Sequence, residues 1–181
     1  MGDKSILILV IRGILMTVNC KTNLVQSGKV STYSVLGGDL YTLLATGEDT
    51  EGTYGLVEVV MQPQSVIPAH SHNFVEAHYV LEGEIEYQLD EQTLVVTSGG
   101  FINLPKGQSH GFRNVQSKPA KLLMWITPAG GEQFFAEVGQ PVNLPMSEEE
   151  KRIHSQPPSP SDIEKAVEIA STKYGLTFAQ A

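Results

Sequence analysis

The feature that most constrains the fold is a succession of short apolar runs that begins near Tyr41. Each run is rich in Val, Ile, Leu, Tyr or Phe and is ended by turn residues. The expected strands cover residues 40–45, 53–61, 65–70, 76–83, 84–90, 93–97, 100–105, 110–115 and 121–127. Runs spaced roughly eight to twelve residues apart, without a helical pattern between them, predict an antiparallel sandwich or barrel. Because parallel strands need a long crossover connection, this spacing excludes βαβ units.

The remaining segments predict short additions to one domain, which a length of 181 residues suits. We expect residues 16–139 to form the barrel together with a capping helix. That helix is predicted over GGEQFFAEVG, residues 130–139, because glycines stand at both of its ends. Its side chains Phe134, Phe135 and Val138 are expected to cover one edge of the barrel.

Residues 140–181 are expected to form a linker and a C-terminal amphipathic helix. The linker is HSQPPSPS, residues 154–161, and Ser161 with Glu164 predicts a capping box at the start of the helix. Apolar residues then recur at helical spacing until Gly175. They are Ile163, Ala166, Val167, Ala170 and Tyr174. We expect this stripe to pack against the core or against a second copy of the chain.

The first residues contain the most apolar stretch of the chain, SILILVIRGILM at residues 5–16. The stretch is too short to span a bilayer, Arg12 interrupts it, and no small-residue cleavage site follows. Either Met1 or Met16 can be the true start. Our hypothesis is that Met16 is the initiator and that residues 1–15 are an N-terminal extension, either not translated or disordered.

Charge and cysteine content exclude several classes of partner. Twelve basic and twenty acidic residues give a formal charge of −8, and no run of Lys or Arg offers a positive surface for phosphates. We therefore expect neither a nucleic acid nor a membrane as partner. The single cysteine, Cys20, cannot form an internal disulfide, so the expected location is cytoplasmic.

The stretch IPAHSHNFVEAHYVLEGE, residues 67–84, carries the candidate metal ligands. Side chains alternate along a strand, so His70 and His72 should face one side with their Cα atoms roughly 6.5–7 Å apart. If the chain turns at residues 73–75, Glu76 returns on the next strand and can supply an oxygen to the same ion. His110 opens a later strand, where antiparallel pairing can bring it opposite the two histidines. Three imidazoles and a carboxylate suit Fe, Ni, Mn, Cu, Co or Zn.

These residues resemble the two paired motifs of the cupin superfamily. The chain contains His70-x-His72-x3-Glu76-x6-Gly83, followed by Gly99-x5-Pro105-x-Gly107-x2-His110-x3-Asn114. The one departure is Gln64, which stands where the family often has a glycine that serves a turn. The resemblance covers about residues 37–139. It implies an all-β double-stranded β-helix, or jelly-roll barrel, with one divalent metal inside.

Two further histidines need separate interpretation. His78 lies two residues beyond Glu76 and should point to the same face of the strand. Three roles stay open for it: a direct ligand, a contact of Glu76 or of the substrate, or a packing residue. His154 lies in the predicted polar linker without partner residues, and we expect it to be exposed to solvent.

The number of ligands separates a structural from a catalytic centre. Four protein ligands close a tetrahedral zinc site, whereas a five- or six-coordinate metal keeps positions open for substrate. A catalytic centre therefore predicts Fe, Ni, Mn, Cu or Co, with Zn kept as an alternative. Apolar residues should line the mouth beside the metal, and this lining favours a flat organic substrate. They are Phe74, Phe101, Phe112 and Met124.

Three other segments resemble the single-domain cupins that are similar to quercetin 2,3-dioxygenase. They are LLATGEDTEGTYGLVEV (43–59), SVIPAHSH (65–72) and TPAGGEQFFAEVG (127–139). The resemblance implies an oxygenase that opens the heterocyclic ring of a flavonol with O2 and releases carbon monoxide. It also implies that His70, His72 and His110 hold the metal, and that Glu76 is both a ligand and the general base for the 3-hydroxyl proton.

Because a fold does not fix a function, two other functions stay open. One is an isomerase or epimerase that acts on a sugar or another small polar metabolite with the metal as Lewis acid. The other is a non-enzymatic cupin that binds a small molecule. Related cupins are usually homodimers, which is also the state expected here.

Overall fold

The computed structural model describes residues 7–11, 14–18, 22, 24–26 and 30–178. In the first two of these segments, β1 (Leu7–Ile11) pairs with β2 (Ile14–Val18) in an antiparallel two-stranded sheet. The predicted N-terminal extension, residues 1–15, therefore lies partly outside the described residues, and its translation stays a prediction. In the described part of the chain, no helix has the length and apolar character needed to cross a membrane.

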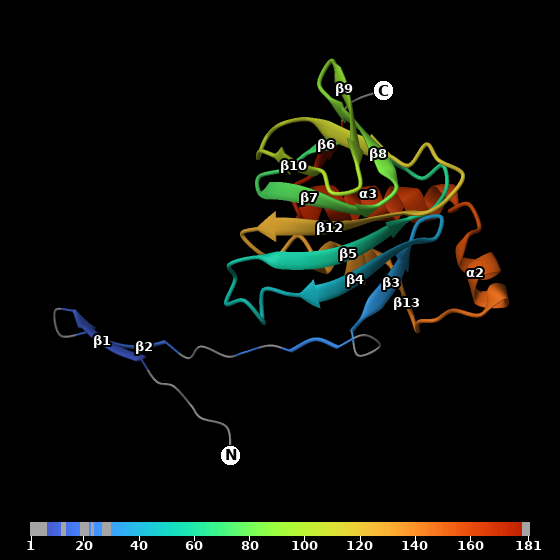
Figure 1. The fold of residues 1–181 in the computed structure, drawn as a ribbon. Helices are drawn as coiled ribbons and strands as arrows, with labels where there is room; N and C mark the ends of the chain where they lie inside the picture. Colours follow the sequence, from blue (N-terminus) through green and yellow to red (C-terminus); the bar gives the residue numbers. More distant parts are fainter. Residues whose placement is uncertain (1–6, 12–13, 19–21, 23, 27–29, 179–181) are drawn as a thin grey trace.

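Two larger antiparallel sheets form the body of the protein (Figure 1). One sheet has the order β10 (Phe101–Leu104), β7 (Val75–Glu82), β12 (Ala120–Thr127), β5 (Gly55–Met61), β4 (Asp39–Ala45), β3 (Thr32–Val35) and β13 (Gln140–Val142). The other has the order β14 (Thr177–Phe178), β6 (Val66–Ser71), β11 (His110–Arg113), β8 (Glu84–Leu89) and β9 (Gln92–Thr97). Every strand pair is antiparallel, so the predicted all-β sandwich or jelly-roll barrel is confirmed.

Each strand expected from the sequence is present, with ends that differ by a few residues. The sequence did not predict β3, β13 or β14. These strands have two to four residues, too few for an alternating pattern to be recognised. They pair at the margins of the two sheets, where a longer neighbour supplies the hydrogen bonds.

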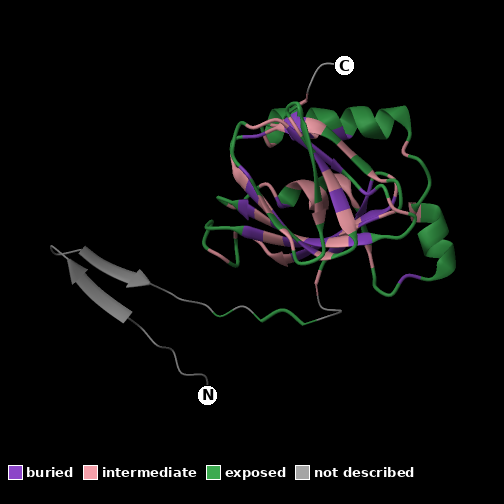
Figure 2. Cartoon of the chain, turned by 45° about the horizontal axis from the view of Figure 1, so that its top comes forward, coloured by how far each residue is buried: buried purple, intermediate pink, exposed green. Residues whose placement is uncertain are grey.

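The core lies between the two sheets. Along β5 and β12 buried residues alternate with less buried ones, as expected for strands with one face against a core. Val59 and Leu122 from the larger sheet are fully buried together with Ile85 from the smaller sheet. Figure 2 shows the buried residues along the strands, while the helices are mostly exposed.

The described residues contain three helices, and the sequence predicted two of them. The capping helix is α1 (Gln133–Val138), which lies within the predicted range. The sequence did not predict α2 (Glu148–His154), although Ser147 and Glu150 form a complete capping box at its start. Because α2 includes His154, the predicted linker begins one residue later, and the half-buried His154 is not the solvent-exposed residue that we expected.

The C-terminal helix is α3 (Pro160–Lys173), and its predicted capping box is wrong. The capping residues are Ser159 and Asp162, not Ser161 and Glu164. The physical reason is Pro160, whose fixed φ and missing N–H suit the first helical position. The helix therefore begins at Pro160, nearer to the N-terminus than predicted.

The apolar stripe of α3 packs only in part. Ala166 and Ala170 are buried, whereas Ile163 and Val167 keep exposed fractions of 44% and 39%. The last two side chains border a cavity between α3 and the sheets. The helix therefore forms one wall of that cavity and does not pack along its whole apolar face.

Two motif positions show why the cupin-like pattern requires glycine at turns. Gly83 and Gly107 have φ values of 81° and 80°, in the left-handed region that side chains disfavour. Gln64 takes the place of a third family glycine, and it adopts the same conformation with φ of 63°. Its side-chain amide donates hydrogen bonds to the carbonyls of Val115 and Gln116, which offset part of the conformational cost.

We predict that at position 64 a glycine variant is more stable than an alanine variant, the reverse of the usual order of stability. Both Gln64→Ala and Gln64→Gly lose the two side-chain hydrogen bonds, but only alanine keeps a Cβ in the left-handed region. The glycine variant should be the more stable by about 0.5–1 kcal/mol, as measured by urea unfolding. At the exposed strand residue Gln92 the same pair of substitutions should give the opposite order. An alanine variant at position 64 as stable as the glycine variant would contradict this account of the turn.

Candidate metal centre

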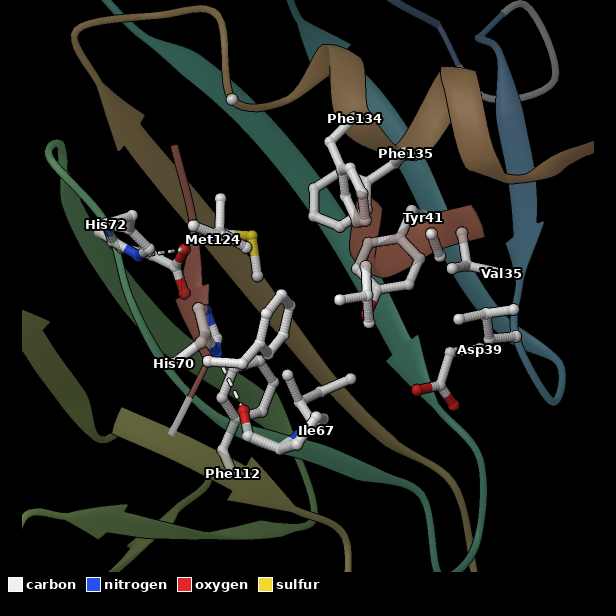
Figure 3. A pocket seen from close by; sticks show the side chains of 18 of the residues that line it. Val35, Asp39, Tyr41, Ile67, His70, His72, Phe112, Met124, Phe134 and Phe135 are labelled. Carbon is white, nitrogen blue, oxygen red and sulfur yellow. Dashed lines mark hydrogen bonds and ion pairs between the residues drawn. The ribbon is translucent and has the colours of Figure 1, made fainter. Parts of the chain in front are cut away.

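Three histidines from two neighbouring strands meet at one point inside the fold, and Figure 3 shows two of them, His70 and His72. His70 lies in β6, His72 follows the end of that strand, and His110 is the first residue of β11. His110 pairs with His70 in the antiparallel register, as the sequence predicted. All three side chains are buried, and one ring nitrogen from each lies within 4.8 Å of the others.

The backbone fixes the orientation of each imidazole. Nδ1 of His70 donates to the carbonyl of Pro68 at 2.9 Å, Nδ1 of His72 to that of Phe74 at 2.9 Å, and Nδ1 of His110 to that of Gln108 at 3.0 Å. Because a carbonyl oxygen only accepts, each Nδ1 carries the proton. In the neutral imidazole the lone pair is then on Nε2.

Nε2 of His72 and Nε2 of His110 are buried and meet no hydrogen-bond partner among the described residues. A buried polar atom without a partner is rare, because its lost hydration is not replaced. A metal ion that accepts these lone pairs would replace it. The residues therefore fit a transition metal, which imidazole nitrogen binds well.

The loop before β11 is attached to the segment that carries the other two histidines. The N–H of Gly107 donates to the carbonyl of His72 at 2.8 Å. At the far end of β11, the buried amide of Asn114 donates to the carbonyls of Met61, Gln62 and Lys118. Both ends of the strand that begins with His110 are thus held, which explains these positions of the second motif.

Glu76 lies beside the three histidines on β7 and is buried. Its Oε2 is 3.4 Å from Nε2 of His72, and its Oε1 is 4.0 Å from Nε2 of His110. Among the described residues, the group whose ligand atoms converge within 4.8 Å contains the histidines alone. The carboxylate is placed to join them, and its role as a fourth ligand stays a prediction.

His78 contacts Glu76 and does not belong to the converging group. Its Nε2 donates to Oε1 of Glu76 at 2.7 Å, since a carboxylate only accepts. Its Nδ1 lies 2.9 Å from the hydroxyl of Tyr87, and burial raises the pKa of that hydroxyl, which keeps it protonated as a donor. His78 is fully buried, and its ring packs edge-on against Phe112. Of the three roles left open for His78, this geometry matches a contact of Glu76.

Burial and neighbouring groups set the charge states of the site. Burial lowers the pKa of His70, and it lowers the pKa of His110 to about 4. Burial alone would raise the pKa of Glu76, but the imidazoles of His72 and His78 beside it hold that pKa well below its ordinary value. At neutral pH the site thus combines the neutral imidazoles of His70 and His110 with an ionised carboxylate, the forms that bind a metal.

A cavity of about 320 Å³ opens beside His70 and His72, which both line it (Figure 3). Phe74, Phe112 and Met124 line it, as the sequence predicted. Phe101 does not line it, and this prediction is wrong. Phe101 pairs with the exposed Tyr79 on the outer face of the sheet and keeps an exposed fraction of 62%.

The C-terminal segment closes one side of the cavity, which sequence reasoning missed. β14 pairs with β6 so that Phe178 stands opposite His70, with their ring centroids 6.0 Å apart. Leu176 and Phe178 both line the cavity together with residues of α3. The only signal in the sequence is a short apolar run after Gly175, which is too short to distinguish a strand from a loop.

Comparison with known proteins agrees with this geometry. The family model described as "Cupin domain" matches residues 57–126. The "Protein SchB" of Streptomyces halstedii is 33% identical over 95 residues, which cover 51% of this chain and 67% of that protein.

The chain belongs to the cupin family. "Polyketide synthase CurC" of Streptomyces cyaneus is 36% identical over 95 residues, which cover 51% of this cupin. The "Quercetin 2,3-dioxygenase" of Bacillus subtilis is 27% identical over 119 residues, which cover 65% of this cupin. The chain spans 60% of the length of the first protein and 35% of the second.

Solved structures share the fold of this cupin at low sequence identity. A cupin of Shewanella frigidimarina described as RmlC-like has a TM-score of 0.54 and 19% identity, and the match covers 60% of this chain and 93% of that one. A predicted oxalate decarboxylase of Thermotoga maritima has a TM-score of 0.55 and 18% identity, over 59% of this chain and 99% of that one. These matches support the jelly-roll fold alone.

We predict that the metal-free cupin loses stability when the pH falls from about 6.5 toward 4. An unfolded histidine takes up a proton near pH 6.5. Folded His110 takes it up only near pH 4, and the pKa of His70 is also lowered. The unfolded state therefore binds more protons in this window, and the free energy of unfolding decreases as the pH decreases. Urea unfolding of chelator-treated protein at pH 7, 6 and 5 measures the change.

The matched control is His110→Asn. This variant removes the contribution of His110, the larger of the two from His110 and His70, so the free energy of unfolding should depend less on pH. A urea midpoint in the original protein that stays constant or rises between pH 7 and pH 5 would show that the buried imidazoles are not held neutral.

Proposed function

We propose that this cupin binds one divalent transition metal through His70, His72, His110 and Glu76. The proposed activity is the oxygen-dependent ring cleavage of a flavonol or a similar aromatic molecule. The observation that carries the proposal is the pair of buried, unpartnered Nε2 atoms of His72 and His110, together with the apolar cavity that His70 and His72 line. Fe, Ni, Mn, Cu or Co suits these ligands, and Zn is an alternative. When bound, such a metal supplies Lewis acidity toward a substrate oxygen and a route for the reaction with O2.

Glu76 is the proposed general base. Its low pKa keeps the carboxylate ionised at neutral pH, which is the form that accepts the proton of a substrate hydroxyl. The hydrogen bond from His78 holds Oε1, while Oε2 lies toward His72. The two carboxylate oxygens therefore have different neighbours: Oε1 is restrained by His78 and lies 4.0 Å from Nε2 of His110, whereas Oε2 lies 3.4 Å from Nε2 of His72 and has no bond to His78.

The hydroxyl of Tyr87 extends this restraint to the second sheet. Tyr87 lies on β8, whereas Glu76 and His78 lie on β7 of the opposite sheet. The chain of hydrogen bonds from Tyr87 through His78 to Glu76 therefore spans the interior. Both partners of Glu76 in this chain are fully buried, so water does not compete for the bonds.

An aromatic substrate fits the lining of the cavity. Phe74, Phe112 and Phe134 present ring surfaces to the cavity, and its volume of about 320 Å³ lies in the range of small-molecule sites. The identity with the Bacillus subtilis quercetin dioxygenase supports a flavonol. The higher identity with "Polyketide synthase CurC" supports a second candidate substrate, a polyketide. Of the polyketides, one with flat rings would suit the aromatic lining of the cavity.

The same lining weighs against the isomerase or epimerase. A sugar or another polar metabolite needs several hydrogen-bonding groups in its site, because its hydroxyls lose water on binding. Apart from the metal-site residues, the described lining offers few polar side chains, such as Asp39, Tyr41 and Ser65. The non-enzymatic alternative, a cupin that binds an aromatic molecule without changing it, stays open and is separated by oxygen consumption.

We predict that the purified cupin bleaches quercetin in air and not under nitrogen. The metal that it carries is first measured by mass spectrometry, and portions are then reloaded with Fe, Ni, Mn, Co or Cu. At least one of these forms should consume O2 as the flavonol absorbance falls, and the chelator-treated protein should not. Tight binding of a sugar, without bleaching by any of the metal forms, would overturn the proposal.

Glu76→Gln is the matched variant for the role of the carboxylate. Glutamine keeps the shape of the side chain but cannot accept the substrate proton as an anion does. Loss of a general base usually lowers the rate by about 100- to 10,000-fold. The variant is compared at equal metal content, so that weaker metal binding does not lower the measured rate. Unchanged turnover would refute the role of Glu76 as base.

A further inference from the structure

The cavity has a second polar end, distant from the three histidines. Figure 3 shows His70 and His72 on one side of the cavity and Tyr41 with Asp39 on the other. Apolar side chains, among them Ile67 and Met124, lie between the two ends. No sequence motif connects the residues at the two ends of the cavity. Asp39 and Tyr41 lie on β4, about thirty residues before His70.

Tyr41 is buried, with an exposed fraction of 3%, and lines the cavity. Its ring stacks on Phe135 of α1, with centroids 4.0 Å apart and an angle of 14° between the ring planes. The stack fixes the position of the ring. The hydroxyl has no hydrogen bond to another described residue, and it is not among the fully enclosed atoms without a partner, which are Nε2 of His72 and of His110. The hydroxyl is therefore open to the cavity that Tyr41 lines, where a ligand can supply the partner that a tyrosine hydroxyl usually has.

Asp39 lies two residues before Tyr41 on β4, so both side chains point to the inner face of the sheet. One carboxylate oxygen accepts from the N–H of Gln62 and the other from the hydroxyl of Ser65. A carboxylate has about four acceptor positions, so each oxygen can accept a second hydrogen bond. Asp39 is 4% exposed, and water reaches it poorly.

The charges around Tyr41 and Asp39 determine whether the hydroxyl keeps its proton and whether the carboxylate can use a further donor. Burial raises the pKa of Tyr41, and the negative charges of Asp39 and Glu76 raise it further. Both carboxylates thus act on a hydroxyl that stays protonated. Burial also raises the pKa of Asp39, against the opposing effect of its bonds with Ser65 and Gln62. An additional donor at this end of the cavity would compensate for that burial.

We propose that Tyr41 and Asp39 form a recognition site for a hydroxyl at the far end of an elongated aromatic ligand. The Tyr41 hydroxyl donates to the ligand oxygen, and Asp39 accepts the ligand proton. The apolar middle of the cavity contacts the rings, and the other end of the ligand meets the metal ligands. This inference rests on the proposed function and narrows its substrate class to phenols with hydroxyls at both ends.

The test uses titration calorimetry under nitrogen to measure the affinity of two flavonols. Each flavonol is titrated into the original protein and into two tyrosine variants. Quercetin carries hydroxyls on both outer rings, whereas 3-hydroxyflavone carries only the 3-hydroxyl. The cupin is used with the metal that it carries after purification. The original protein should bind quercetin about tenfold more tightly than 3-hydroxyflavone, the value of one good buried hydrogen bond. Tyr41→Phe should remove most of this preference and leave the binding of 3-hydroxyflavone unchanged.

Tyr79→Phe is the control, because Tyr79 lies on the outer face of β7 and is exposed. It should keep the full preference for quercetin. An equal preference in the original protein and in Tyr41→Phe would overturn the inference, and so would the absence of binding by both flavonols. Binding under nitrogen needs no turnover, so the recognition site can hold even when the oxygen-dependent reaction fails.

Discussion

The structure of the site depends on three hydrogen bonds from imidazole Nδ1 to backbone carbonyls. These bonds fix the tautomer and the orientation of His70, His72 and His110, so that their Nε2 lone pairs converge. Burial keeps the imidazoles of His70 and His110 neutral. A protein that buries unpartnered acceptors in this way is stabilised by whatever accepts their lone pairs, so a metal bound here would be a component of the fold.

The two sheets give this arrangement its rigidity. The register of β6 and β11 sets His70 opposite His110, and the turn at Gly107 is held by the carbonyl of His72. From the other sheet, Glu76 approaches the same point and is connected through His78 to Tyr87. The cavity extends from this polar end through an apolar middle to Tyr41, so a ligand that fills it contacts both sheets and α3.

Much of the site could be predicted from the sequence because it depends on local rules. Strand alternation placed His70 and His72 on one side, and antiparallel pairing placed His110 opposite them. The face of Phe101 could not be predicted, because it follows from the register of β10 with β7. The proposed role of Tyr41 could not be predicted either, because it depends on contacts between residues distant in sequence, such as the stacking on Phe135. β14 has two residues, which is too few for a periodic signal.

The most direct test of the account is X-ray absorption spectroscopy of the cobalt-loaded protein. The account predicts one cobalt ion per chain, with several imidazole nitrogens at about 2.0–2.2 Å. It also predicts that the imidazole signal weakens in His72→Ala and in His110→Ala. A ligand shell of oxygen atoms alone, or a spectrum that neither substitution changes, would contradict the metal centre on which the rest of the account depends.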